Sequence, residues 1–230
     1  MADALHGQAV DTIRTIFDEV LTSDNVIGKS ASLGTILSKL TKDYHRIAGS
    51  FVDVWAAEHL EAIASDTMNR FGLTRVKRGQ RLSKEDLEVY FSWLEGQPEQ
   101  PVLVNFKATS LEIETSGKNP NLVSYGKIRY AFTLNPRLIY MLVSFKHRRH
   151  ELGIEISSVD LVELKDLHEG DIVYNRRLNQ LQLRDIRQIR VQPRTVDEFI
   201  RIIDEKFIRS RGKGEWQREI DRFRTGSQAR

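Results

Sequence analysis

Two polar side chains, Asn105 and Lys107, follow the apolar run 101–104 of this chain. On an extended strand, side chains two positions apart leave the same face, so both would point toward one place. Asp86 precedes a second strand-like run at 87–94. Carboxylate and amide oxygens can bind Mg²⁺, and an ammonium beside them can stabilise charge on a phosphate. These residue types at this spacing predict a metal-assisted site that acts on a phosphate ester.

Four residues have distinct roles in the predicted site. Asp86 and Asn105 would be side-chain metal ligands, and Phe106 would add its backbone carbonyl. Lys107 would lie beside the attacking water and stabilise charge on the phosphorus oxygens. A purely structural explanation competes with this one, because an apolar strand that ends in a polar residue and a lysine often arises by chance.

Asn105 is the unusual member of the site, because an amide oxygen brings no negative charge to a metal. Three interpretations follow. The chain is an inactivated variant of an enzyme, or an enzyme whose second acid comes from elsewhere, or a binding protein. Glu112 and Glu114 are the acids nearest in sequence, and Glu58 is a candidate auxiliary acid. The intact remainder of the motif favours the first interpretation.

Hydrophobic periodicity predicts helices at both ends of the chain and strands between them. The predicted helices cover 3–22, 33–44, about 50–70, 121–131, a segment capped by Thr195, and 214–224. The predicted strands cover 87–94, 102–107, 138–145 and 153–163, with short ones near 172–183 and 186–192, and a turn at 147–150. The first two strands form an antiparallel hairpin, and 138–145 is apolar enough to be central. The pattern indicates one α/β (α+β) domain over 1–230, with helices 3–70 and 195–224 flanking a mixed sheet at 86–192.

Two segments are candidates for contacts with nucleic acid. A predicted strand would alternate apolar residues with Gln and Arg side chains, which can form paired hydrogen bonds with base edges. A loop rich in Lys and Asn precedes the predicted helix at 121–131. The residues concerned are Lys118, Asn119, Asn121, Gln188, Arg190 and Gln192. An exposed, solvated surface explains the same pattern equally simply.

The composition is that of an ordinary globular protein, with 40% hydrophobic and 29% charged residues in 230 and a net charge of +3. Basic residues cluster late in the chain, where Arg176, Arg177, Arg184, Arg187, Arg190 and Arg194 accompany the single acid Asp185. Such clusters attract polyanions. The absence of cysteine excludes disulfides, thiolate metal sites and cysteine nucleophiles. With neither a signal peptide nor an apolar run of about 20 residues, the sequence predicts a cytoplasmic protein with no membrane segment.

The order of several short motifs resembles a known family. An acid-headed strand is followed by Val104-Asn-Phe-Lys-Ala108 and Lys118-Asn-Pro-Asn121, then by Leu164-Lys-Asp-Leu167 and Arg194-Thr-Val-Asp-Glu-Phe-Ile200. In this order the chain resembles the rare-cutting Type II restriction endonucleases of the SwaI kind, or of the related PmeI kind, in the PD-(D/E)xK superfamily.

The resemblance implies a restriction-endonuclease-like fold and a bacterial, homodimeric, Mg²⁺-dependent enzyme. Such an enzyme hydrolyses both strands of a palindromic DNA site, here one of eight A/T-rich base pairs. It implies that Asp86 and position 105 are the acidic ligands and that Lys107 is the lysine. The chain departs from the family at Asn105, so the resemblance leaves cleavage in question and DNA binding intact. A non-catalytic, sequence-specific DNA-binding protein is therefore the alternative.

Overall fold

The computed structural model describes residues 2–40, 44–66, 68, 70–79, 85–92, 99–112, 120–185 and 187–210. The chain divides into two compact units. The first contains Met1–Lys118 and Ile139–Glu163, and the second contains Asn119–Leu138 and Leu164–Arg230. Each unit is thus assembled from two separate stretches of sequence. One domain over 1–230 stays a prediction.

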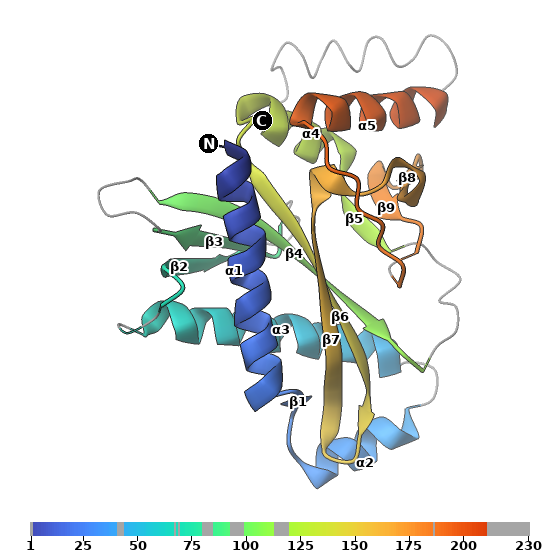
Figure 1. The fold of residues 1–230 in the computed structure, drawn as a ribbon. Helices are drawn as coiled ribbons and strands as arrows, with labels where there is room; N and C mark the ends of the chain where they lie inside the picture. The colour runs from blue at the N-terminus through green and yellow to red at the C-terminus, as the bar shows by residue number, and fades with distance from the viewer. Residues whose placement is uncertain are drawn as a thin grey trace. The chain divides into compact units, whose positions relative to one another are not determined.

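The first unit is a six-stranded mixed sheet with helices packed on it (Figure 1). Its elements are α1 (Ala2–Ser23), β1 (Val26–Ile27), α2 (Ala31–Lys39), α3 (Tyr44–Ser65), β2 (Leu73–Arg78), β3 (Leu87–Phe91), β4 (Gln100–Ser110), β6 (Ile139–His150) and β7 (Gly153–Glu163). The strand order is β1-β7-β6-β4-β3-β2. Only β4 and β6 pair in parallel, and the other neighbours are antiparallel. The predicted mixed sheet flanked by helices is confirmed.

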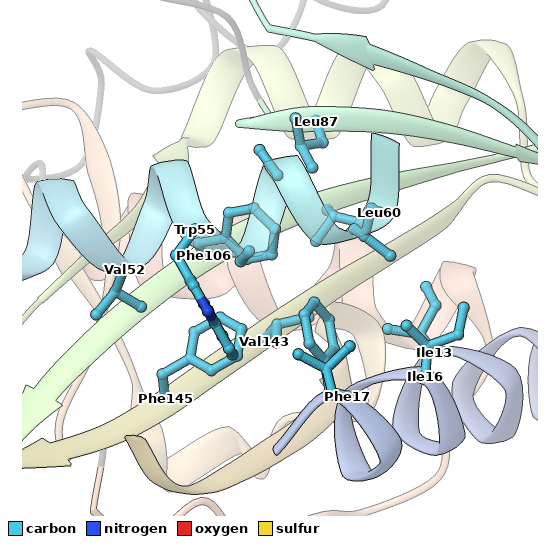
Figure 2. Packing of buried hydrophobic residues seen from close by; sticks show 14 of the residues in the cluster. Ile13, Ile16, Phe17, Val52, Trp55, Leu60, Leu87, Phe106, Val143 and Phe145 are labelled. Carbon is cyan, nitrogen blue, oxygen red and sulfur yellow. The ribbon is translucent and has the colours of Figure 1, made fainter. Parts of the chain in front are cut away.

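The central position of β6 follows from its sequence. Residues 139–145 are all buried, as a strand covered on both faces requires. One face of β4 and β6 packs against α1 and α3, where Phe17 and Trp55 lie 5.1 and 5.8 Å from the ring of Phe145 (Figure 2). Phe106 joins the same cluster, 5.7 Å from Phe145. The aromatic core therefore fixes β4 at the position from which the predicted site extends.

Several predicted boundaries in the first unit were wrong. The strand β6 continues through the predicted turn at 147–150, because a register shift after Lys146 lets it stay paired with β7 to Gly153. Gly153 then permits a close approach: a Cβ there would lie 2.0 Å from the Ile27 carbonyl oxygen. Helix α3 covers Tyr44–Ser65, so it begins before the predicted start near residue 50 and ends before 70. Strands β1 and β2 were not predicted.

Within its described residues, the second unit has a three-stranded sheet, in the order β5-β9-β8, and two helices. Its elements are β5 (Asn121–Ser124), α4 (Tyr125–Leu134), the 3-10 turns η1 (Leu164–Asp166) and η2 (Glu169–Asp171), β8 (Ile172–Asn175), β9 (Gln180–Leu183) and α5 (Val196–Ser210). The predicted helix at 121–131 thus begins as a strand. The segment described at 187–192 is irregular apart from one bridge at Val191, so the predicted strand there is wrong. The predicted helix at 214–224 lies outside the described residues.

Thr195 caps α5 as predicted. Its hydroxyl accepts from the Glu198 amide at 3.2 Å, while Glu198 Oε2 accepts from the Thr195 amide at 2.8 Å. This reciprocal pair is a capping box. The buried stripe of the helix carries Phe199, Ile203 and Phe207, which recur at helical spacing.

A buried ion pair joins α4 and α5. Asp204 accepts hydrogen bonds from Arg129 Nε at 2.8 Å, Arg129 Nη2 at 3.0 Å and the Tyr125 hydroxyl at 2.6 Å. Tyr125 also stacks on Phe207 at 4.4 Å. The Asp204 carboxylate therefore pairs with the guanidinium of Arg129, a residue that is buried from water.

We expect Asp204→Ala to destabilise the protein by about 3–5 kcal/mol, because it leaves the buried Arg129 cation unpaired. Denaturant unfolding followed by circular dichroism measures the change. Glu205→Ala is the matched control, since Glu205 forms an exposed pair with Arg209 on the same helix. Such pairs contribute about 0–1 kcal/mol. Equal effects of the two substitutions would contradict the role of Asp204.

Candidate active site

The site begins where β4 runs past the end of β3. Leu87, the first residue of β3, pairs with Val104 of β4. The amide of the preceding residue, Asp86, donates to the Val104 carbonyl at 2.9 Å. The next edge donor of β4 is the Phe106 amide, which donates to Asp86 Oδ2 at 2.6 Å. The Asp86 carboxylate therefore accepts the hydrogen bond that a backbone carbonyl of a neighbouring strand would otherwise accept. This bond holds the carboxylate beside β4. Asp86 is itself exposed, so its carboxylate remains accessible.

Lys107 lies at the same edge. Its Nζ donates to the Phe106 carbonyl oxygen at 2.8 Å. Burial lowers the pKa of the Lys107 ammonium, whereas the carboxylates of Asp86 and Asp53 act to raise it. The structure thus brings Asp86, the Phe106 backbone and Lys107 together. The metal-binding and catalytic roles of these residues stay a prediction.

Asn105 is buried, with 6% of its surface exposed. Because Val104 and Phe106 belong to the aromatic core, alternation along β4 directs Asn105 to the opposite face. There it hydrogen-bonds with Tyr140, whose pKa is raised well above its usual value by burial and by the charges of Asp86 and Glu85. Asn105 Oδ1 has no hydrogen-bond partner within the described parts of the chain. Asn105 therefore has a buried oxygen acceptor that is not otherwise engaged, and its part in the site stays a prediction.

Asp53 was missed by the sequence reasoning. It lies on α3, and its carboxylate interacts electrostatically with both Asp86 and Lys107. Burial, and then the charge of Asp86, raise the pKa of Asp53 to about 6, while Lys107 acts to lower it. A signal was present in the sequence: Asp53 interrupts the helical stripe that also contains Val52 and Ala56. An acid within the buried face of an amphipathic helix requires a specific partner.

Of the other candidate acids, Glu58 and Glu112 have different surroundings. Glu58 is exposed on α3 and lines a surface hollow with Asp24 and Lys29. Glu112 accepts from the Arg149 amide at 2.7 Å and lies 3.3 Å from the Arg149 Nε, so Arg149 engages it. Glu114 lies outside the described residues. None of these three is placed by the structure beside Asp86 and Lys107.

Of the residues predicted to contact DNA, those that the structure describes do not lie together on one exposed strand. Lys118 and Asn119 lie outside the described residues, and Asn121 begins β5, where its side-chain oxygen accepts from Gln182 at 2.7 Å. Gln188 and Gln192 are exposed but lie in irregular chain. Arg190 is held by Asp171, which accepts from its Nε at 2.9 Å and its Nη2 at 2.5 Å. The alternating strand is therefore wrong, and base contact by these residues stays a prediction.

The oxygen atoms of the site fit a hard divalent cation. Asp53 and Asp86 offer carboxylates, Phe106 a carbonyl, and Asn105 an unengaged amide oxygen. Mg²⁺ is commonly bound through one or two carboxylates together with water and substrate phosphate. Across the described ranges, no group of three or more His, Cys, Asp or Glu side chains could hold a metal. The fit thus rests on two carboxylates and neutral oxygens.

Comparison with known proteins identifies the class. The family described as "Type II restriction endonuclease HpaI" matches residues 8–222. The Type II restriction enzyme HpaI of Haemophilus parainfluenzae is 32% identical over 177 residues, which cover 70% of this chain and 68% of that enzyme. The chain therefore belongs to the HpaI family of Type II restriction endonucleases, a family of nucleases.

A solved structure, the NlaIV restriction endonuclease, matches 80% of this chain and 76% of its own with a TM-score of 0.45 and 12% identity. The predicted resemblance to Type II restriction endonucleases is confirmed at the level of the family. The nearer likeness to SwaI or PmeI, and the PD-(D/E)xK assignment, stay predictions. No helix among the described residues is long and apolar enough to span a membrane.

We expect Asp53→Asn to stabilise the metal-free protein above pH 6. The folded pKa of Asp53 is raised from 3.8 to about 6, so the folded state binds this proton more tightly than the unfolded state does. Stability is therefore lost between about pH 4 and 6 as the buried carboxylate ionises. At pH 8 the asparagine variant should be more stable by about 1–3 kcal/mol, with no difference below pH 4.

Thermal and denaturant unfolding in EDTA across this pH range measure the difference. Glu58→Gln, an exposed acid on the same helix, should change stability by no more than about 0.5 kcal/mol at any pH. A pH-independent effect of Asp53→Asn would show that Asp53 is not a buried, repelled carboxylate.

Proposed function

We propose that this chain is a Mg²⁺-dependent endonuclease that hydrolyses a phosphodiester bond in each strand of a palindromic DNA site. The observation that carries the proposal is the meeting of Asp86 and Lys107 on the Phe106 backbone, in a member of a restriction endonuclease family. The length and base composition of the site, predicted as eight A/T-rich pairs, are not fixed by this observation.

The reaction adds one water to one phosphodiester. The water oxygen bonds to phosphorus, one P–O ester bond breaks, and the departing oxygen ends as a hydroxyl after gaining a proton. When bound, Mg²⁺ supplies Lewis acidity to a phosphate oxygen. Asp86, Asn105 and the Phe106 carbonyl would hold the cation, as oxygen ligands suit it.

Lys107 serves as a fixed hydrogen-bond donor beside the reacting phosphate. Its ammonium is held by the Phe106 carbonyl at 2.8 Å, so little reorganisation is required when negative charge develops on the phosphate. Its lowered pKa follows from burial, and the neighbouring carboxylates favour the charged form. The residue therefore combines a positive charge with a position set by the strand.

A homodimer follows from the palindrome. A site with two-fold symmetry presents the same half-site twice, so one protomer reads each half and one site faces each strand. The partner is thus a second copy of this chain on double-stranded DNA. The compartment proposed is the bacterial cytoplasm, with no membrane partner.

A non-catalytic, sequence-specific DNA-binding protein is the second candidate. The specific observation in its favour is Asn105, which contributes no charge where a metal-binding carboxylate was expected. Binding requires only that basic and polar groups meet the DNA. Cleavage requires in addition that a metal be held.

We expect the purified chain to cut genomic DNA into discrete fragments when Mg²⁺ is present and to bind it without cutting in EDTA. Lys107→Ala should lower the cleavage rate by about 10²–10⁴-fold with little change in binding, because the lost donor acts on the developing charge. Asn105→Asp should increase cleavage at limiting Mg²⁺, since it adds a ligand charge. Gel electrophoresis of the fragments and mobility-shift titrations give the two readouts.

Lys39→Ala, which removes an exposed lysine from α2, is the control for a general loss of positive charge. It should leave the cleavage rate within about twofold, as surface substitutions usually do. If neither the natural chain nor Asn105→Asp cuts DNA that it binds specifically, the DNA-binding candidate replaces the nuclease.

A further inference from the structure

We infer that Asp53 of α3 supplies the second metal-binding carboxylate that position 105 of the strand lacks. The inference rests on the proposed nuclease function, which requires a held cation. It assigns the missing negative charge to a residue far from the motif in sequence. Asn105 then remains as a neutral oxygen on the opposite face of β4, beside Tyr140.

The packing of α3 on β4 determines where Asp53 lies. Val52 and Ala56 of the helix share one core with Val104 and Phe106 of the strand. A Cβ built on Gly49 would lie 4.0 Å from the Cβ of Ala108, so this turn of the helix approaches the strand beyond the site. Figure 2 shows Val52 and Trp55 on the helix that passes beside Phe106.

Asp53 is placed on this same face of the helix. It follows Gly49 by four residues and precedes Ala56 by three, and both spacings keep side chains on one face. Its carboxylate is partly buried and interacts electrostatically with Asp86 and Lys107 together. The packing of α3 on β4 thus brings the Asp53 carboxylate within electrostatic range of Asp86 and Lys107.

The charges of this group favour a divalent cation. Asp53 and Asp86 repel each other, and the single ammonium of Lys107 balances only one of them. Two carboxylates that remain close without a full complement of positive charge gain from binding a cation between them. An aspartate at position 105, in place of Asp53, would give the site the same total charge. The helix therefore supplies the charge that the strand does not.

The test is metal binding without DNA. Isothermal titration with Mn²⁺ should give a saturable site in the natural chain, weakened by about tenfold or more in Asp53→Asn, because ligand charge sets the affinity of such sites. Glu58→Gln is the matched control: an exposed acid five positions along the same helix, whose loss should change the Mn²⁺ affinity by less than about twofold. Equal binding by the natural chain and Asp53→Asn overturns the inference.

A double variant that moves the carboxylate from α3 to β4 provides a second test. Asp53→Asn combined with Asn105→Asp returns one carboxylate to the site from the strand, and Mn²⁺ affinity should recover to within about threefold of the natural chain. Failure of the pair to recover, with folding verified by circular dichroism, overturns the assignment of both residues to one site. Absence of any Mn²⁺ site in the natural chain also overturns it.

DNA cleavage, measured on the same proteins, distinguishes a failure of the Asp53 assignment from a failure of the nuclease proposal. If the natural chain cuts DNA and Asp53→Asn keeps its Mn²⁺ affinity, the nuclease stands and the role of Asp53 falls. If Asp53→Asn loses Mn²⁺ and the natural chain never cuts, the metal site stands and the nuclease falls.

Discussion

The backbone of one residue, Phe106, organises the candidate site. Its amide and carbonyl lie on the edge of β4 that extends past β3, where both form hydrogen bonds with side chains. Asp86 accepts from the amide and Lys107 donates to the carbonyl, so two opposite charges are held by one peptide segment. The Phe106 ring is buried among Phe17 and Phe145. The positions of a carboxylate and an ammonium therefore depend directly on the packing of an aromatic core.

The same arrangement has an electrostatic cost. Asp53 and Lys107 are partly removed from water, and burial disfavours the charged form of each. Asp53 shows the consequence, since its pKa is raised to about 6. Sites that must hold a cation or a developing charge are commonly assembled in this way, with stability given up in the empty protein. The rigid sheet of the first unit is what allows these like charges to remain together.

Sequence reasoning succeeded where the determining interactions are local or strictly periodic. The β3–β4 hairpin, the buried β6 strand and the capping box of α5 each follow from neighbouring residues. It failed where distant contacts decide. The β6 strand crosses the predicted turn at 147–150 because β7 remains paired with it, and the strand predicted at 186–192 has only the bridge at Val191. Asp53 was missed because helix-to-sheet packing brings it to β4, and nothing in the spacing of the strand motif refers to α3.

The location of Asn105 gives a physical reason for an acid on the helix and not on the strand. The side chain at position 105 is buried beside Tyr140, in a region that already contains the charges of Asp86 and Glu85. An aspartate there would add a third negative charge to a poorly solvated face of the sheet, which costs free energy whenever no cation is bound. Asparagine avoids that cost and still hydrogen-bonds with Tyr140. Asp53 approaches from α3 and has Lys107 close by, so its charge is partly compensated. A carboxylate delivered by the helix thus maintains the charge of the site while the buried face of the strand stays neutral.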